Sequence, residues 1–271
     1  MLELLKAAGA CSAGCVAAEK LRPRMTPEQW QRALERTPGL KSLVCAAFPY
    51  GPEKVTSGLL SVYARGDDYH DVLRARLAPV AEKLAQRYPG CRFDFYADVS
   101  PFPEVYAAAR AGLGKLGQNG LLIVPGAGSF VFLGFLATDA QLPEAGGEII
   151  PCSGCGACQK ACPGGALGQR FDAGRCLSAI TQKRGQLTEE ETDLVKQGGM
   201  LWGCDRCQLV CPENQNRTVP PLPEFLPQAD PSAADLQLSD RAFRRQFAGR
   251  AFTWRGVQPL RRNLEILKEE S

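Results

Sequence analysis

The sequence predicts an α/β (α+β) domain, a second domain with the cysteine spacing of ferredoxins, and a short basic helical segment at the C-terminal end. Apolar runs of strand length alternate with amphipathic stretches of helix length over 27–138, which is typical of mixed α and β domains. Cysteines recur at short intervals over 152–211. Pro- and Gly-rich connections place the domain boundaries at 1–146, 147–217 and 218–271.

The overall composition is that of an ordinary globular protein of 271 residues with a net charge of +3 and twelve cysteines. Disulfide scaffolds are short secreted chains, so these cysteines favour a reducing cytoplasm. No apolar run reaches the length of a membrane-spanning helix, and the N-terminus lacks the basic start of a signal peptide. We therefore expect a cytoplasmic protein with no membrane contact. The net charge is too small to indicate nucleic-acid binding by itself.

The N-terminal residues 1–18 predict a short helix followed by a glycine-broken turn that contains Cys11 and Cys15. These two thiols form either a redox pair or part of the core, and the core interpretation is favoured because free cysteines are usually buried. Thr26 is expected to cap a helix over 27–36, with Pro27 at its first position.

The next strand is predicted over 41–48, where an unbroken apolar run is typical of burial on both faces. A long helix follows over 68–88, because one stripe at helical spacing is apolar: Val72, Leu73, Leu77, Val80 and Leu84. The pattern returns to a strand over 91–97. Cys45, within the first of these strands, is expected in the core.

A short connection then leads to a predicted helix over 103–111, with Gly112 at its C-terminal cap. Asp98 lies in this connection, where open α/β sheets place ligand crevices at the carboxyl ends of strands. The ordinary alternative for Asp98 is a helix cap. Apolar runs at 121–124 and 130–138 predict a hairpin, and residues 235–268 are expected to be helical and basic.

The cysteine pattern begins with Cys152, Cys155 and Cys158 at intervals of three, followed by Cys162 and a proline. In bacterial ferredoxins this spacing serves two [4Fe-4S] clusters, and the fourth cysteine ligates the other cluster. The second half is supplied by Cys176, Cys204, Cys207 and Cys211.

Because the fourth cysteine of each run ligates the other cluster, the eight cysteines divide into two ligand sets. One set is Cys152, Cys155, Cys158 and Cys211, and the other is Cys162, Cys176, Cys204 and Cys207. The alternative is a pair of four-thiolate zinc sites, which also use closely spaced cysteine pairs. Zinc sites do not require the triple run and its proline ending, so the spacing favours iron–sulfur clusters and electron transfer.

Two other motifs are weaker evidence for cofactor binding. The glycines at 112, 114 and 117 have dinucleotide-binding spacing but follow a predicted helix, whereas that motif follows a strand. Asp68-Tyr-His70 begins like a histidine-on corrinoid signature but lacks its glycine. His70 is the sole histidine, so we expect a structural role for it rather than axial ligation of a metal.

Taken together, several segments resemble the epoxyqueuosine reductase family, and the resemblance covers nearly the whole chain. It is carried by the cysteine pattern and by these further segments: Arg24-Met-Thr-Pro27, Asp68-Tyr-His70, Asp98 with Ala111-Gly-Leu-Gly114, Gly128-Ser-Phe-Val-Phe132, Cys176-Leu-Ser-Ala-Ile-Thr181, Gly203-Cys-Asp-Arg-Cys-Gln208 and Trp254-Arg-Gly-Val-Gln-Pro-Leu-Arg-Arg-Asn263.

The resemblance implies a cobalamin-dependent iron–sulfur reductase that converts epoxyqueuosine to queuosine in the anticodon loop of tRNA. It implies that Asp98 is the proton donor and that Arg24, Asn119 and Ser129 lie in motifs around the corrinoid. Burial beside an apolar corrin face is expected to raise the pKa of Asp98. The implied partners are tRNA and a small electron-donor protein such as ferredoxin or flavodoxin.

Two departures from the family pattern bear on the substrate and the site. Many members have a lysine where this sequence has Gln118, and members continue into a helical-repeat domain that helps to hold tRNA, whereas this sequence ends at Ser271. A related corrinoid reductase of small molecules, similar to reductive dehalogenases, and a non-catalytic electron carrier therefore stay open as alternatives.

The C-terminal residues 241–262 interleave seven arginines with four aromatic residues. This mixture suits phosphate contact and base stacking on RNA. The alternative is a solvated basic helix face with its aromatic side chains in the core.

Overall fold

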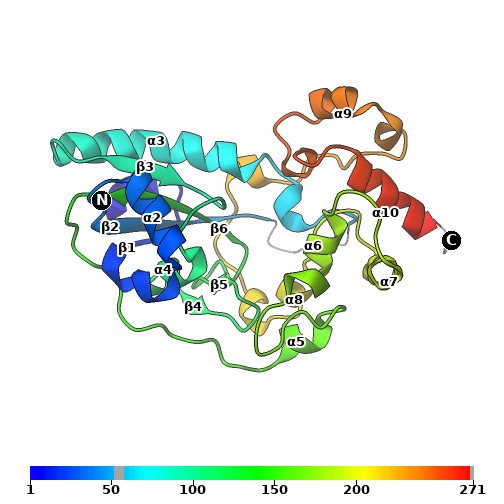
Figure 1. The fold of residues 1–271 in the computed structure, drawn as a ribbon, viewed down its shortest axis with the longest axis horizontal. Helices are drawn as coiled ribbons and strands as arrows, with labels where there is room; N and C mark the ends of the chain where they lie inside the picture. The colour runs from blue at the N-terminus through cyan, green and yellow to red at the C-terminus, as the bar shows by residue number, and fades with distance from the viewer. Residues whose placement is uncertain (52–57, 269–271) are drawn as a thin grey trace. The chain divides into compact units, whose positions relative to one another are not determined.

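The computed structural model describes residues 1–51 and 58–268, which form two compact units (Figure 1). Unit 1 contains Met1–Pro49, Tyr69–Gly154 and Asn216–Leu222, and unit 2 contains Tyr50–Asp68, Cys155–Gln215 and Pro223–Ser271. The chain thus enters unit 2 briefly before the long helix and returns to unit 1 for seven residues after the last cysteine.

The centre of unit 1 is a four-stranded sheet of order β1-β2-β6-β3, in which every neighbouring pair is antiparallel. Its strands are β1 (Ser12–Ala17), β2 (Ser42–Pro49), β3 (Phe93–Tyr96) and β6 (Val131–Thr138). Every residue of β2 is buried, as the unbroken apolar run predicts. The antiparallel arrangement means that Asp98 does not follow a parallel strand, so the carboxyl-edge argument for its position is wrong.

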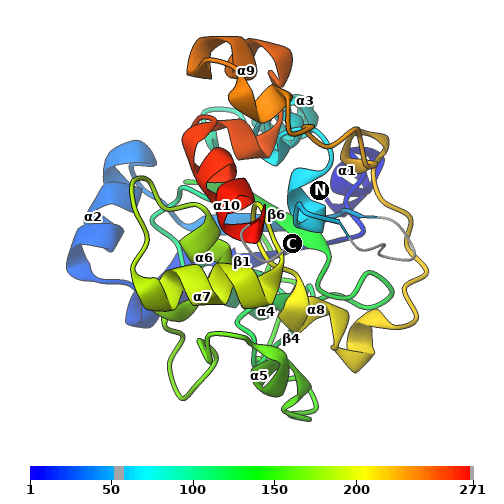
Figure 2. The ribbon, with the colours of Figure 1, turned by 90° about the vertical axis from the view of Figure 1, so that its right-hand side faces the viewer.

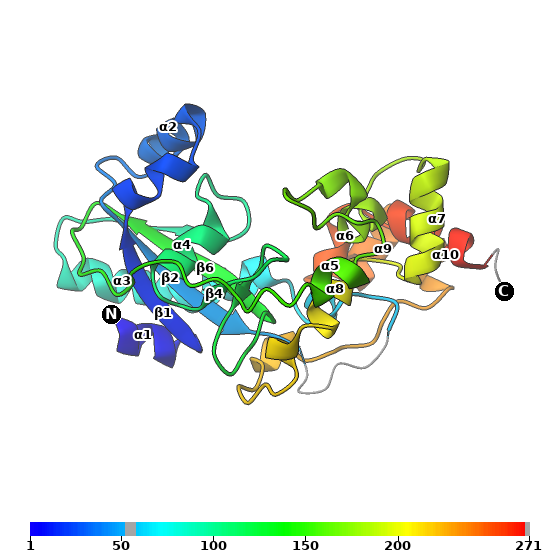
Figure 3. The ribbon, with the colours of Figure 1, turned by 90° about the horizontal axis from the view of Figure 1, so that it is seen from below.

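Helices cover both faces of this sheet (Figure 3). Helices α1 (Leu2–Ala7) and α3 (Tyr69–Arg87) lie on one face, where Leu73 and Leu77 of α3 pack over Gly134. Helices α2 (Pro27–Arg36) and α4 (Glu104–Arg110) lie on the other face, where they share a core with Cys45 and Phe135. The sheet is therefore the middle of three layers.

The predicted helices of unit 1 are confirmed, with ends that differ by at most one residue where bounds were predicted. Thr26 caps α2 through a capping box in which its hydroxyl accepts from Gln29 N–H at 3.2 Å and the Gln29 side chain accepts from Thr26 N–H at 2.8 Å. The apolar stripe of α3 is buried at every predicted position. Gly112 has a φ of 83° directly after the last turn of α4, which only glycine adopts without strain.

Two local predictions in unit 1 are wrong. The expected hairpin over 121–138 does not form, because β5 (Leu122–Ile123) pairs with β4 (Lys115–Leu116) in a separate two-stranded sheet while β6 joins the main sheet. The expected turn around Cys15 is instead the strand β1. Cys15 and Cys45 are both fully buried, which confirms that they are core residues, and Cys11 packs against the same core.

Unit 2 is built from short helices (Figure 2). They are α5 (Ala157–Ala161), α6 (Leu177–Thr181), α7 (Glu189–Gly198), α8 (Arg206–Leu209), α9 (Asp240–Gln246) and α10 (Gln258–Lys268). Helix α10 packs against α6 and α7, and α5 packs against α8. Short 3-10 turns connect elements in both units: Ala18–Lys20, Arg22–Arg24, Val62–Ala64, Ala173–Arg175, Pro212–Asn214, Pro223–Phe225, Asp235–Gln237 and Ala251–Thr253.

The C-terminal residues belong to unit 2 and do not form a separate tail. Phe243, Phe252 and Leu260 are fully buried in one core with Trp202. We expected residues 218–271 to form a separate segment after a boundary at 217. The structure, which describes this part of the chain up to Lys268, instead places the residues from Pro223 onwards in unit 2. The physical reason is the amphipathic character of α10, whose apolar side requires a partner surface. Within the described residues, no helix is both long and apolar enough to cross a membrane.

Candidate functional site

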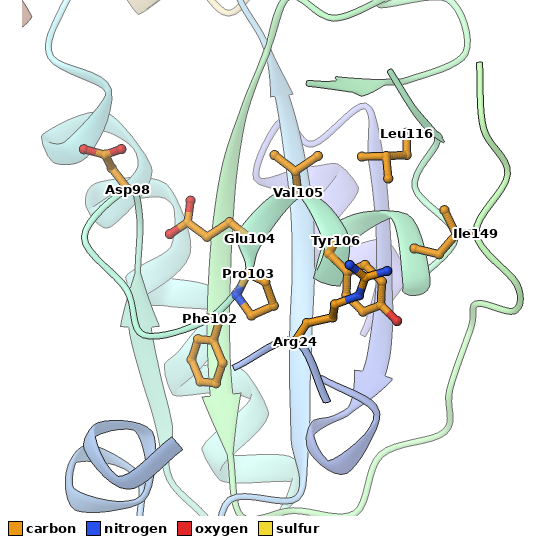
Figure 4. A pocket seen from close by; sticks show the side chains of 9 residues that line it. All are labelled: Arg24, Asp98, Phe102, Pro103, Glu104, Val105, Tyr106, Leu116 and Ile149. Carbon is orange, nitrogen blue, oxygen red and sulfur yellow. The ribbon is translucent and has the colours of Figure 1, made fainter. Parts of the chain in front are cut away.

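Unit 1 contains a cavity of about 760 Å³ beside the N-terminal end of α4 (Figure 4). This volume is within the range of small-molecule sites. Its walls combine apolar side chains with two carboxyl groups and one guanidinium. The described lining residues are Arg24, Asp98, Phe102, Pro103, Glu104, Val105, Tyr106, Leu116 and Ile149.

Asp98 lies at this cavity in an unusual backbone conformation. Its φ is 58°, and no other non-glycine residue within the described ranges has a positive φ. This left-handed conformation is uncommon for a residue with a side chain, and such strain concentrates at functional sites. Asp98 is therefore held at the cavity by its loop, and it does not cap α4, whose N-cap is Pro103.

The Asp98 carboxylate lies beside His70, with 3.4 Å between Oδ2 and Nε2, and the two groups form an ion pair when the imidazole is protonated. The hydrogen bond from His70 lowers the pKa of Asp98, and this effect outweighs the desolvation that would raise it. In this structure the Asp98 side chain is 59% exposed, and the expected rise of its pKa on burial beside a corrin face stays a prediction. His70 itself stacks on Tyr69, and Tyr69 stacks on Phe132 of β6.

Glu104, the first residue of α4, is a second carboxyl group in the same cavity, and sequence reasoning missed it. Burial is the main cause that raises the pKa of Glu104 to about 7, and the negative charge of Asp98 adds to the effect. Its Oε1 atom is buried and has no hydrogen-bond partner among the described residues. The available sequence signal was a second acid six residues after Asp98 in the same strand-to-helix connection.

The three residues assigned to the corrinoid motifs occupy different environments. Arg24 lines the cavity and lies over the Tyr106 ring, 5.3 Å from its centroid. Asn119 is buried and accepts a hydrogen bond from Leu121 N–H at 3.3 Å, which is a local turn contact. Ser129 is also buried. Of these three, Arg24 alone is among the described residues that line the cavity with Asp98.

Two neighbouring loops of unit 2 bring together cysteines of the first proposed ligand set. Burial raises the pKa of the Cys211 thiol, and nearby Cys155 and Cys158 raise it further. Gly156 precedes α5 in the left-handed conformation, with a φ of 73°, which turns the chain between the two cysteines. Cys152 falls in unit 1, where its sulfur accepts a hydrogen bond from Gln118 N–H at 3.4 Å.

The second proposed set lies around the start of α6. Burial raises the pKa of the Cys204 thiol to about 11, and the nearby Asp205 and Cys176 groups contribute to this increase. The Cys162 sulfur accepts a hydrogen bond from Ala166 N–H at 3.3 Å. Backbone N–H groups directed at sulfur are what an iron–sulfur cluster requires, because they stabilise its negative charge.

No three side chains of His, Cys, Asp or Glu converge on a single-ion position within the described residues. A cubane cluster distributes its four thiolate ligands over four iron atoms, so its cysteines need not converge on one point. Tetrahedral zinc requires all four ligands around a single ion. The thiol donors present therefore suit cubane clusters.

The arginines and aromatic residues of 241–262 are mainly structural. Phe243 and Phe252 are in the core, and Arg250, which is 5% exposed, donates to the carbonyl oxygens of residues 64–66 and 229. Arg261 and Arg262 also donate to backbone carbonyls. Trp254 is 51% exposed, with the Arg255 guanidinium 3.7 Å from its ring centroid. The arrangement favours the core alternative for most of this segment.

Two family models match different parts of the chain. Residues 151–214 match a 4Fe-4S double cluster binding domain, and residues 31–99 match epoxyqueuosine reductase QueG, DUF1730. The prediction of two [4Fe-4S] clusters is confirmed by the first match.

Curated relatives are similar along most of the chain. It is 37% identical over 260 residues to an epoxyqueuosine reductase of Lactococcus garvieae, which covers 91% of this chain and 71% of that protein. It is 34% identical over 244 residues to an epoxyqueuosine reductase of Bacillus cereus, which covers 83% of this chain and 63% of that protein. The chain therefore spans less than two thirds of the length of this second relative.

Solved structures share the fold. An epoxyqueuosine reductase from Bacillus subtilis, with the aspartate-bearing catalytic loop swung out of the active site, has a TM-score of 0.84 at 29% identity and covers 98% of this chain and 79% of that chain. An epoxyqueuosine reductase in complex with an epoxyqueuosine-modified tRNA-Tyr stem loop has a TM-score of 0.81, with the same identity and coverage. Together with the 37% identity to the L. garvieae protein, these findings show that the chain belongs to the epoxyqueuosine reductase family.

Proposed function

We propose that the protein is a cobalamin-dependent iron–sulfur reductase that converts epoxyqueuosine to queuosine in tRNA. The observation that carries this proposal is the cavity of unit 1, which is lined by Asp98 and Glu104 together with apolar side chains. The net change breaks both C–O bonds of the epoxide, forms a C=C bond and releases the oxygen as water. It consumes two electrons and two protons.

Electron supply is the role of the clusters of unit 2. We assign one cluster to Cys152, Cys155, Cys158 and Cys211, and the other to Cys162, Cys176, Cys204 and Cys207. The nearness of Cys211 to Cys155 and Cys158, and of Cys204 to Cys176, supports this crossed assignment. A small electron-donor protein of the ferredoxin or flavodoxin class would reduce these clusters in the cytoplasm.

The cavity residues fit a corrinoid. Phe102, Val105 and Ile149 supply apolar surface for a flat macrocycle, and the Arg24 guanidinium suits the polar amide groups at its edge. The His70 imidazole is engaged with Asp98, which supports a corrinoid held without a histidine ligand. Such a cofactor, when bound, supplies a strongly reducing, nucleophilic cobalt.

Asp98 is proposed to protonate the epoxide oxygen as the ring opens. Its strained loop presents the carboxyl group at the cavity, and contact with His70 holds it there as a carboxylate. Release of that contact when substrate enters would raise the pKa of Asp98 towards the operating range of a general acid. The swung-out catalytic loop of the B. subtilis enzyme supports a movable loop at this position.

The test is conversion of epoxyqueuosine tRNA by anaerobically purified protein reconstituted with iron, sulfide and cobalamin. Nucleosides from the digested tRNA are separated by mass, and a loss of one oxygen from epoxyqueuosine is the expected result. A protein that carries both cofactors and leaves the nucleoside unchanged would contradict the proposal. Corrinoid binding without affinity for tRNA would favour a small-molecule reductase.

A further inference from the structure

The proposed reaction requires two protons for each oxygen that leaves as water, whereas Asp98 carries one. The described residues that line the cavity include one other carboxyl group, Glu104. Figure 4 shows the carboxyl group of Glu104 on the same side of the cavity as Asp98, with no labelled side chain between them. The inference below rests on the proposed function, because it concerns the second of these protons.

The surroundings of Glu104 favour its protonated form. Its buried Oε1 atom has no hydrogen-bond partner among the described residues. A buried, unpartnered carboxylate oxygen costs more free energy than a neutral carboxylic acid at the same place, so burial favours retention of the proton. Ser100 and the backbone of Asp98 act in the opposite direction and lower the pKa of Glu104, but burial outweighs them.

The groups around Glu104 come from two elements and one connection. Asp98 and Ser100 approach from the loop before α4, His70 approaches from α3, and the Cys45 thiol of β2 lies beneath it. Asp98 raises and His70 lowers the pKa of Glu104. The pKa of Asp98 is thus lowered and that of Glu104 is raised, which favours the carboxylate at Asp98 and the protonated acid at Glu104. Of the two, Glu104 therefore retains its proton more readily near neutral pH, whereas Asp98 does so only when its contact with His70 is released.

We propose that Glu104 is the second proton donor of this site and gives its proton to the oxygen that departs as water. In the first step Asp98 protonates the opening epoxide, so that a hydroxyl group forms and one C–O bond breaks. In the second step Glu104 protonates that hydroxyl group while the second C–O bond breaks and the C=C bond forms. The two electrons come from the reduced iron–sulfur clusters, and both carboxylates regain protons from water.

The direct test is the protonation state of Glu104 in the holoenzyme. Infrared difference spectroscopy on protein labelled with ¹³C-glutamate resolves the carbonyl band of a protonated glutamic acid. We expect one such band at neutral pH, which is lost as the pH rises above about 7 and is missing from Glu104→Gln. The matched control Glu82→Gln changes an exposed residue of α3 and should keep the band. A band that is absent at neutral pH, or present in Glu104→Gln, would overturn the proposal.

A second variant tests the same idea if Glu104→Gln fails to fold. Ser100→Ala removes a hydroxyl group that lowers the pKa of Glu104, so the infrared titration should move to higher pH. An unchanged titration would mean that the measured band belongs to another glutamate.

Turnover provides the functional test. We expect Glu104→Gln to lower kcat by about 10²-fold or more while KM for tRNA stays unchanged, as for loss of a general acid. The wild-type rate should fall as the pH rises through the titration of Glu104, and this limb should be absent from the variant. Wild-type kcat in Glu104→Gln would overturn the proposal. If the wild-type protein itself fails to convert the epoxide while the infrared band titrates as expected, the proposed function fails and the proton-holding role of Glu104 stands.

Discussion

Asn263 of α10 connects two cysteine-bearing segments of unit 2, and its replacement by alanine provides a sharp test of the fold. The side chain is fully buried, and its Nδ2 donates to the carbonyl oxygens of Thr181 and Leu201, both at 2.8 Å. Thr181 ends the helix that begins after Cys176, and Leu201 lies three residues before Cys204. The Thr181 hydroxyl also accepts from Gly203 N–H at 2.9 Å.

The magnitude follows from these bonds. Each donated hydrogen bond contributes about 1 kcal/mol, and a buried carbonyl left without a partner costs a further 1 to 3 kcal/mol or so. The Thr181 carbonyl retains a bond from Arg262 at 3.4 Å, so mainly the Leu201 carbonyl is orphaned. We expect Asn263→Ala to lower the free energy of unfolding by about 3 kcal/mol and the Tm of unit 2 by about 6 to 12 °C.

The assay is anaerobic thermal and urea unfolding, with the visible absorbance of the clusters followed in parallel. Cluster loss should accompany unfolding at the lower midpoint, because the two segments carry Cys176 and Cys204. The matched control is Glu265→Ala, an exposed position on the same helix, which should change stability by less than about 0.5 kcal/mol. An Asn263→Ala protein as stable as this control would refute the reasoning that α10 holds the cysteine segments together.

The remaining predictions concern the cofactors and the cavity. Cys176→Ala and Cys211→Ala are each expected to retain about half of the iron, because each removes a ligand of a different cluster; complete iron loss in both variants would contradict independent ligand sets. Asp98→Asn should lower kcat by about 10²- to 10⁴-fold with corrinoid affinity unchanged, and full activity would exclude Asp98 as the acid. His70→Phe removes the hydrogen bond that is the main cause of the lowered pKa of Asp98, so the part of the pH–rate profile that reports Asp98 should move to higher pH, and an unchanged profile would show that the pair is absent in solution. Glu104 binds its proton more tightly in the folded state, where its pKa is about 7, than at the ordinary value of 4.5. The free energy of unfolding should therefore fall by about 3 kcal/mol as the pH rises across this interval. Glu104→Gln should abolish that fall when unfolding is compared at about pH 5 and about pH 8.

Sequence patterns were sufficient to predict those elements whose structure depends on interactions between residues close in the chain. The apolar stripe of α3 and the capping residue Thr26 of α2 are recognisable because burial and capping depend on neighbours within the same element. The failed hairpin over 121–138 has a different cause. Strand β6 pairs with β2, which lies more than 80 residues earlier in the chain, and no local signal specifies a partner at that distance.

The residues of the candidate site likewise divide into those that the sequence predicted and those that it did not. Asp98 was found through a family resemblance, and the cysteines through their spacing, because both are patterns of residue type along the chain. Glu104 and the ion pair between His70 and Asp98 were not found, since they depend on which side chains the loop before α4 brings together.

The sequence by itself determined the two [4Fe-4S] clusters, because the spacing of thiolates along a short chain limits which metal centre they are able to hold. It also determined the main helices of unit 1 and its buried strand β2 through the periodicity of apolar residues. Only the tertiary structure decided that the pKa of one carboxyl group of the cavity is lowered and that of the other raised, because desolvation and ion pairing depend on distances in space that residue order does not encode.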